Sequence, residues 1–132
     1  MKYVVDTHAL IWFLEGNSRL GANARTILSA ADSQLILPAI ALAEAVWIVE
    51  RGKTAIPSVT ALLDVVSSDS RVMVYPLDRA VIDQSVGLAA IHEMHDRQIV
   101  STALVLQSQG ETVSVLTCDQ NITASGLVPI VW

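Results

Sequence analysis

Cysteine, positive charge and long hydrophobic runs are scarce in this sequence of 132 residues. Cys118 is the only cysteine, which excludes an internal disulfide and is typical of a reducing compartment. Eight basic residues stand against thirteen acidic ones, and the formal net charge of −5 argues against a passive nucleic-acid-binding module. No apolar run approaches the roughly 18 residues of a membrane span, and no signal-peptide core follows Met1. We therefore expect a cytoplasmic protein.

Motifs of several large enzyme classes are missing as well. The sequence has no Walker loop, no dinucleotide-binding fingerprint and no serine triad. His8, His92 and His95 share no regular spacing, so we expect ordinary structural or solvent-facing roles for them, although His95 adjoins Asp96 and could touch a substrate. Cys118 lies in an apolar run, and we expect its thiol to be inert.

Apolar residues, in contrast, are abundant. They make up 52% of the chain, and the mean hydropathy is +0.51, which is high for a domain of this size. Part of the apolar surface is therefore expected to be covered by a partner, either a second copy of the chain or another protein. Trp12, Phe13 and Trp47 are expected in the core, with a place at a dimer interface as the alternative for one of them.

Short apolar strands alternate with helical patterns along the chain. Strands are expected at residues 3–5, 35–37, 72–75, 112–116 and 130–132. Helices are expected to follow Asp6 and to span residues 22–31, 38–51, 57–66, 78–94 and 96–109. This alternation predicts one α/β domain over residues 1–132, with a mainly parallel sheet covered on both faces.

Four acidic residues occupy positions that suggest a site. Asp6 and Asp119 close strands, Asp96 opens a helix, and Glu44 is the only polar side chain from Ala39 to Val49 in an otherwise apolar helix. If the strands are parallel, all four can converge at one edge of the sheet. Each also has a simpler interpretation: Asp6 and Asp96 as helix caps, Asp119 in an Asx turn, and Glu44 reaching solvent.

Converging carboxylates require a cation. Two like charges about 4 Å apart repel by roughly 4 kcal/mol at an effective dielectric near 20. Ligand sets made only of oxygen favour Mg²⁺ or Mn²⁺ over Zn²⁺. Such a site can activate water for attack on a phosphodiester, and its bound cations reverse the local charge. The acidic composition therefore argues less strongly against a metal-dependent nuclease.

Together these segments resemble the PIN-domain ribonucleases, particularly the VapC-type toxins of toxin–antitoxin systems. The resemblance extends over nearly the whole chain to Trp132, and the order and spacing of the four acids agree with it. The segments that carry it are Asp6 to Trp12, Leu42 to Glu44, Glu50 to Lys53, Asp96-Arg97, and Thr117 to Ile122.

The resemblance implies a three-layer α/β/α fold and Mg²⁺- or Mn²⁺-dependent endonucleolytic cleavage of RNA. It also implies a homodimer and inhibition by a cognate antitoxin protein that covers the site. By position, the acidic metal site corresponds to Asp6, Glu44, Asp96 and Asp119, with the hydroxyls of Thr7 and Thr117 as supporting groups.

Two departures from the family pattern lie near these acids. Many relatives have Asp-Pro-Phe before the Asp-Arg pair, where this chain has Glu93, Met94 and His95. The lysine often found one turn after the helical Glu is replaced by Ile48. Both changes could alter RNA contacts or the loop beside Asp96.

Two other functions remain open from sequence. The first is a non-catalytic interaction module that keeps the acids for binding a metal or a partner. The second is a phosphatase or phosphoacceptor domain with Asp6 as covalent nucleophile, which would normally need a lysine from a later strand, and no lysine follows Lys53. Arg51 and Lys53 could hold phosphate, but a basic helix end also interacts favourably with the helix dipole.

Overall fold

Five parallel strands form one sheet at the centre of the fold. The computed structural model describes residues 1–132 and gives the strand order β3-β2-β1-β4-β5, with every neighbouring pair parallel. The strands are β1 (Lys2–Val5), β2 (Gln34–Pro38), β3 (Val72–Tyr75), β4 (Val113–Leu116) and β5 (Ile130–Val131). The predicted parallel α/β sheet is confirmed.

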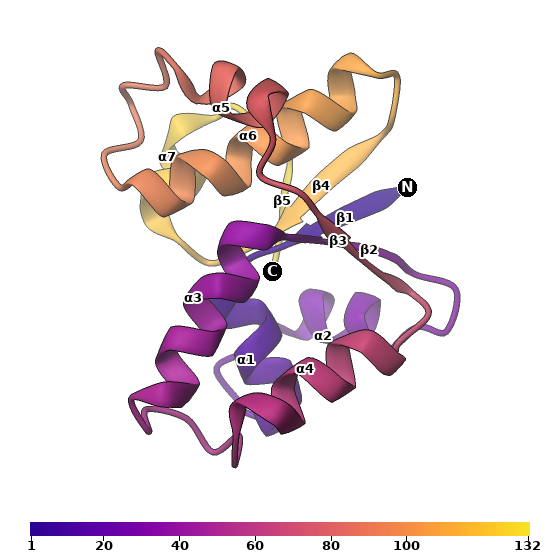
Figure 1. Ribbon diagram of the computed structural model, residues 1–132. Helices are drawn as coiled ribbons and strands as arrows, with labels where there is room; N and C mark the ends of the chain where they lie inside the picture. Colours follow the sequence, from indigo (N-terminus) through magenta and orange to yellow (C-terminus); the bar gives the residue numbers. More distant parts are fainter.

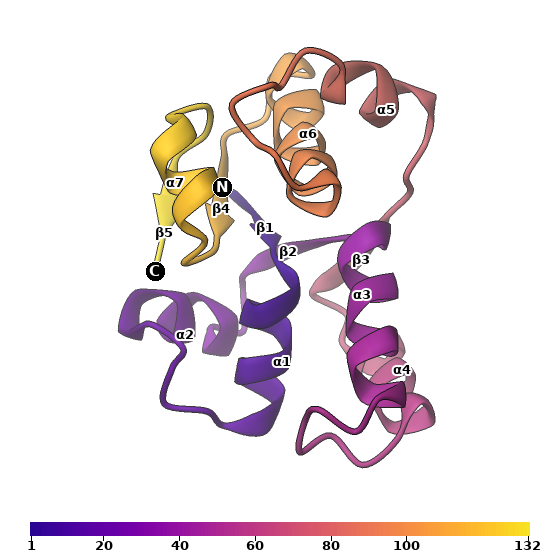
Figure 2. The ribbon, with the colours of Figure 1, turned by 90° about the vertical axis from the view of Figure 1, so that its left-hand side faces the viewer.

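Helices cover both faces of the sheet and complete three layers (Figure 1). They are α1 (Thr7–Glu15), α2 (Ala22–Ser29), α3 (Ala39–Glu50), α4 (Val59–Ser68), α5 (Arg79–Ser85), α6 (Met94–Ser108) and α7 (Gln120–Ser125). The chain crosses the sheet in one direction from β1 to β3 and returns in the other through β4 to β5. Because crossovers between parallel strands are right-handed, α1 to α4 lie on one face and α5 to α7 on the other, as Figure 2 also shows.

The inner strands are buried on both faces, which explains their continuous apolar sequences. All four residues of β4 are buried, and Val4 of β1 and Val115 of β4 have no exposed surface. Trp12 and Phe13 pack partly buried against this core, whereas Trp47 is 53% exposed, so the expectation that Trp47 is a core residue is wrong. No helix has the length and apolar character needed to cross a membrane.

The helix expected over residues 78–94 is much shorter in the structure. Asp78 caps α5 as predicted, accepting a hydrogen bond from the Val81 N–H at 3.1 Å. The helix ends at Ser85, and Gly87 follows with φ of +89°, a left-handed conformation that favours glycine. Residues 86–93 therefore form a connection rather than helix.

Two further boundaries differ from expectation. Ser58 caps α4 by accepting from the Ala61 N–H at 3.1 Å, so the helix begins at Val59 and Pro57 lies outside it. The segment after Asp119, expected to be a loop, forms the short helix α7. Neither difference moves a strand, so the order of the sheet is unaffected.

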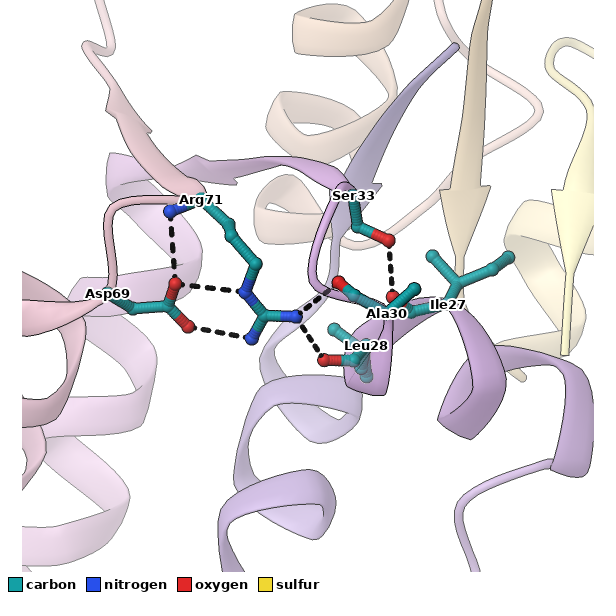
Figure 3. A network of polar contacts seen from close by, with 6 residues as sticks. All are labelled: Ile27, Leu28, Ala30, Ser33, Asp69 and Arg71. Atoms are coloured by element: carbon teal, nitrogen blue, oxygen red, sulfur yellow. Dashed lines mark hydrogen bonds and ion pairs between the residues drawn. The ribbon is translucent and has the colours of Figure 1, made fainter.

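At the amino ends of the strands, Arg71 connects α2 to β3 (Figure 3). Its guanidinium donates to the carbonyl oxygens of Leu28 and Ala30 at 2.7 and 2.8 Å and to both carboxylate oxygens of Asp69 at 3.0 and 2.8 Å. The two carbonyls lie at the C-terminal end of α2, where helical partners are missing. This end of the sheet is therefore held by a structural clamp.

Candidate functional site

The opposite edge, at the carboxyl ends of the strands, contains a topological switch point. After β1 the chain turns to the face covered by α1, and after the neighbouring strand β4 it turns to the other face, toward α7. The Asp6 N–H donates to the Leu116 carbonyl at 3.3 Å, so pairing of β1 with β4 continues to the base of this crevice. Open α/β sheets bind ligands at such a point.

Asp6 and Asp119 lie at the switch point, and each caps the helix that follows it. Oδ1 of Asp6 accepts from the Ala9 N–H at 2.8 Å, and Oδ1 of Asp119 accepts from the Ile122 N–H at 3.0 Å. The capping interpretation of Asp6 is confirmed, and capping also describes Asp119. Because capping uses only one oxygen of each carboxylate, the other remains available in the crevice.

The four predicted acids line one cavity, which we call the acid cavity. Its volume is about 320 Å³. Asp6 and Asp119 enter it from the strand ends, Glu44 from the middle of α3, and Asp96 from the first turn of α6. The other lining residues are Thr7, His8, Trp12, Glu93, Ile99 and Cys118. Five carboxylates thus face one histidine, with no lysine or arginine among the lining residues.

Burial and crowding raise the pKa values of two of these carboxyls, Asp96 and Asp6. Burial, followed by repulsion from Asp119, Glu93, Glu44 and Asp6, raises the pKa of Asp96 to about 7. Burial also raises the pKa of Asp6, although a hydrogen bond with Thr117 and the Ala9 N–H partly offset it. The carboxylates of the acid cavity therefore repel one another when ionised, and a bound cation would relieve that repulsion.

The chemical type of the candidate ligands suits a hard divalent cation. All candidate ligands are carboxylate oxygens, which Mg²⁺ and Mn²⁺ prefer. No three His, Cys, Asp or Glu side chains are grouped closely enough to hold an ion directly. Ion binding would therefore require the carboxylates to approach one another.

The two threonines considered from sequence have different roles. The Thr117 hydroxyl accepts from the Asp119 N–H at 3.0 Å, and its proximity to Asp6 lowers the pKa of that carboxyl, so it lies beside both acids of the switch point. The Thr7 hydroxyl donates to the Ala41 carbonyl at 3.4 Å. Thr7 therefore contacts α3 one turn before Glu44 rather than the acids themselves.

Glu93 is the cavity residue that sequence reasoning missed. It caps α6, accepting from the Asp96 N–H at 3.0 Å, and its other carboxylate oxygen lies 2.5 Å from Nδ1 of His95. Asp96 is consequently a first-turn residue, and its interpretation as the helix cap is wrong. Glutamate is not among the preferred N-cap residues, so only its position three residues before Asp96 could have indicated this role.

Cys118 also lines the acid cavity, but it is not a ready nucleophile. Burial and the nearby charge of Asp6 raise the pKa of its thiol. Because the thiolate is the reactive form, this environment disfavours cysteine chemistry and agrees with the expectation of an inert residue.

Solved structures of several bacterial proteins share this architecture. VapBC2 from Rickettsia felis, bound to a DNA fragment from its promoter, matches with a TM-score of 0.71 and 16% identity over 98% of this chain and 97% of that one. Mycobacterium tuberculosis VapC20, described as a sarcin–ricin loop cleaving toxin, matches with a TM-score of 0.69 and 16% identity over 96% of this chain and 97% of that one. DNA-bound VapBC from Salmonella typhimurium matches with a TM-score of 0.66 and 16% identity over 98% of this chain and 96% of that one. At this identity the likeness shows a common fold.

Sequence comparison identifies the family. A search of curated proteins finds no significant match. A model of the PIN domain, however, matches residues 3–125, a range that contains every carboxylate of the acid cavity. The resemblance noted in the sequence is thereby confirmed, and the chain belongs to the PIN domain family.

Proposed function

We propose that this protein is a metal-dependent endoribonuclease and the toxin of a type II toxin–antitoxin pair. The observation that carries the proposal is the convergence of Asp6, Glu44, Asp96 and Asp119 on one cavity at the switch point of the sheet. Membership of the PIN family supports it, as does the fold shared with VapC20, a toxin described as cleaving the sarcin–ricin loop. The proposed substrate is RNA in the cytoplasm.

The proposed ligands of a Mg²⁺ or Mn²⁺ ion are these same four acids. A bound ion would supply positive charge for the scissile phosphate and lower the pKa of a water molecule. Capping bonds fix the carboxylates of Asp6 and Asp119 in direction, and the Thr117 hydroxyl lies beside both residues. Glu44 and Asp96 reach the cavity from helices on opposite faces of the sheet. The protein would thereby surround the phosphate from both faces.

A second copy of the chain and a cognate antitoxin are the proposed protein partners. The Rickettsia and Salmonella relatives are VapBC structures, and this chain leaves large apolar side chains exposed on α4, β3 and α5. These side chains are Leu63, Val65, Met73, Val74 and Ile82. Light scattering should give twice the chain mass of 14.2 kDa, and a further increase with the product of a small adjacent gene. If the chain is a monomer and its solution mass does not change when the product of the adjacent gene is added, this part of the proposal is contradicted.

The decisive experiment compares two capping aspartates. Asp6 and Asp78 both cap helices, but only Asp6 lines the acid cavity. Asparagine caps as well as aspartate, so Asp6→Asn and Asp78→Asn should both fold. A fluorogenic single-stranded RNA is incubated with the wild type and each variant, with Mn²⁺, Mg²⁺ or excess EDTA. We expect metal-dependent cleavage by the wild type and Asp78→Asn and none by Asp6→Asn.

Other outcomes separate the rival functions. Equal cleavage by all three proteins would indicate contamination and refute the assignment of the site. Stabilisation of the wild type by Mn²⁺, without cleavage of any RNA, would favour a non-catalytic module that binds metal. A phosphoenzyme trapped on Asp6 would favour the phosphatase alternative.

A further inference from the structure

Three basic side chains have neither an ion-pair partner nor a side-chain hydrogen bond within the chain, and they lie on segments that border the acid cavity. Five of the eight are engaged: Lys2, Arg71 and Arg79 in ion pairs, and Arg25 and Arg97 with backbone carbonyls. Arg19, Arg51 and Lys53 form neither an ion pair nor a side-chain hydrogen bond. In a chain of net charge −5, free cations concentrated in one region indicate an anionic ligand there.

Arg19 and Lys53 lie on one side of the acid cavity. They line a hollow of about 210 Å³ that shares His8 and Trp12 with the acid cavity. The Arg19 guanidinium carbon lies 5.9 Å from the centroid of the Trp12 ring. Glu15 lines the same hollow, and its carboxylate accepts from the Thr54 hydroxyl and the Ala55 N–H. A chain leaving the acid cavity on this side would therefore pass two positive charges and one carboxylate that is already hydrogen-bonded.

Trp47 and Arg51 extend from the acid cavity along α3. Trp47 follows Glu44 by three residues, so both lie on one face of the helix, and Arg51 follows Trp47 by four. The Arg51 guanidinium carbon is 4.0 Å from the centroid of the Trp47 ring. Glu44 and Trp47 line a hollow of about 400 Å³ together with Ala43 and His95, and Glu44 belongs to the acid cavity as well.

We propose that Trp47 and Arg51 form a stacking platform for one unpaired base of a single-stranded RNA. The backbone of that RNA would cross the acid cavity toward Arg19 and Lys53. The proposal rests on the proposed nuclease function and adds how the strand is held. Aromatic rings and arginine planes bind unpaired bases of any sequence, because every base presents a π face.

The charges favour RNA over a protein as the occupant. A protein bound to Trp47 would explain the exposed indole, but it would leave Arg19 and Lys53, in the other hollow that adjoins the acid cavity, unexplained. A phosphate backbone that reached both hollows would supply an anion to each cation. The acid cavity, which adjoins both hollows, is then the place where a cation and the cleaved phosphate would meet.

The test measures binding of a fluorescein-labelled 12-nucleotide single-stranded RNA by anisotropy, with Ca²⁺ present to screen the carboxylates and a gel to confirm that the probe stays intact. Trp47→Ala should weaken binding about 10-fold, and Trp47→Phe, which keeps a stacking ring, by less than about 3-fold. Val86→Ala, at an apolar position that is 77% exposed on another surface, should change nothing. Arg51→Gln should weaken binding, whereas Arg79→Gln should not.

Two readouts separate stacking from a structural effect. RNA should quench the tryptophan fluorescence of the wild type more than that of Trp47→Phe. A duplex RNA of the same sequence should bind wild type and Trp47→Ala equally, because its bases are not available to stack. If Trp47→Ala does not fold, the Phe variant and the quenching decide the question.

The platform is refuted if the wild type binds no single-stranded RNA, or if Trp47→Ala binds it as tightly as the wild type. A lower solution mass of Trp47→Ala with unchanged RNA affinity would assign Trp47 to an interface between copies instead. If Asp6→Asn abolishes cleavage and Trp47→Ala leaves it unchanged, the proposed nuclease function is supported and the stacking platform is refuted. If RNA binding depends on Trp47 but the wild type cleaves no RNA, the stacking platform is supported and the proposed nuclease function is refuted.

Discussion

Replacing Asp96 by asparagine should make the metal-free protein more stable at pH 8. Burial and four neighbouring carboxylates raise the pKa of Asp96 to about 7 from an ordinary value of 3.8. An acid with a raised folded-state pKa binds its proton more tightly in the folded protein, so its ionisation destabilises the fold. The penalty is absent below pH 3.8, grows as the pH rises to about 7, and is complete above it.

The size of the effect follows from three contributions. A difference of roughly 3 pKa units corresponds to about 4 kcal/mol at most. Asp96 is partly exposed, and screening by solvent reduces this figure to about 1–2 kcal/mol. Loss of its favourable interaction with the N-terminus of α6 offsets about 0.5 kcal/mol. The net gain of about 1 kcal/mol should raise the melting temperature by about 4 °C in a domain of this size.

Thermal unfolding in EDTA between pH 4 and 8 is the assay, with Asp64→Asn as the control. Asp64 is an exposed acid on α4, so its replacement makes the same change in net charge away from the acid cavity. The advantage of Asp96→Asn should shrink as the pH falls toward 4, and added Mn²⁺ should stabilise the wild type more than the variant. Equal shifts from both variants, or a lower melting temperature for Asp96→Asn at pH 8, would refute the reasoning.

Three further substitutions test other parts of the structure. Gly21→Ala would place a Cβ 2.4 Å from the backbone carbon of the C-terminal residue, so urea unfolding should show a loss of about 1–3 kcal/mol; unchanged stability would contradict the close packing. Arg71→Met should cost about 2 kcal/mol because it leaves unpaired the carbonyls of Leu28 and Ala30 and one carboxylate oxygen of Asp69, whose other oxygen keeps the backbone N–H of residue 71; Arg79→Met, in an exposed pair, should cost less than about 0.5 kcal/mol, and equal costs would argue against the clamp. Thr117→Val should weaken Mn²⁺ binding about 10-fold by calorimetry, while Thr7→Val should leave it within about 2-fold; the reverse order would misplace the supporting hydroxyl.

The parallel sheet and the position of the acids were predictable because both depend on local patterns. Buried parallel strands have continuous apolar sequences, and Asp6 and Asp119 directly follow two of them. Parallel pairing then brings their carboxyl ends to one edge. The sequence could not show that β1 and β4 are neighbours, since strand order depends on packing between distant segments.

The errors concern features decided by the tertiary surroundings. The apolar sequence of α3 does not reveal which of its faces lacks a covering element, so Trp47 was assigned to the core. Helical spacing continues past Ser85 in the sequence, but Val86 adopts an extended conformation that ends the helix, and Gly87 follows in a left-handed conformation. Glu93 takes a capping position in which Ser, Thr, Asp or Asn is usual, and this explains why the sequence offers Asp96 as the alternative cap.

The pairing of β1 with β4 also determines when the acid cavity can exist during synthesis. Asp6 is synthesised before Glu44 and Asp96, and Asp119 after them. The Asp6 N–H has its partner on Leu116, so the strand end that carries Asp6 is fixed only after β4 has inserted beside β1. A chain synthesised only as far as α6 therefore contains three of the four acids but no complete cavity. For a protein that cleaves RNA, this order of assembly would delay activity until β4 and Asp119 have been made and β4 has paired with β1.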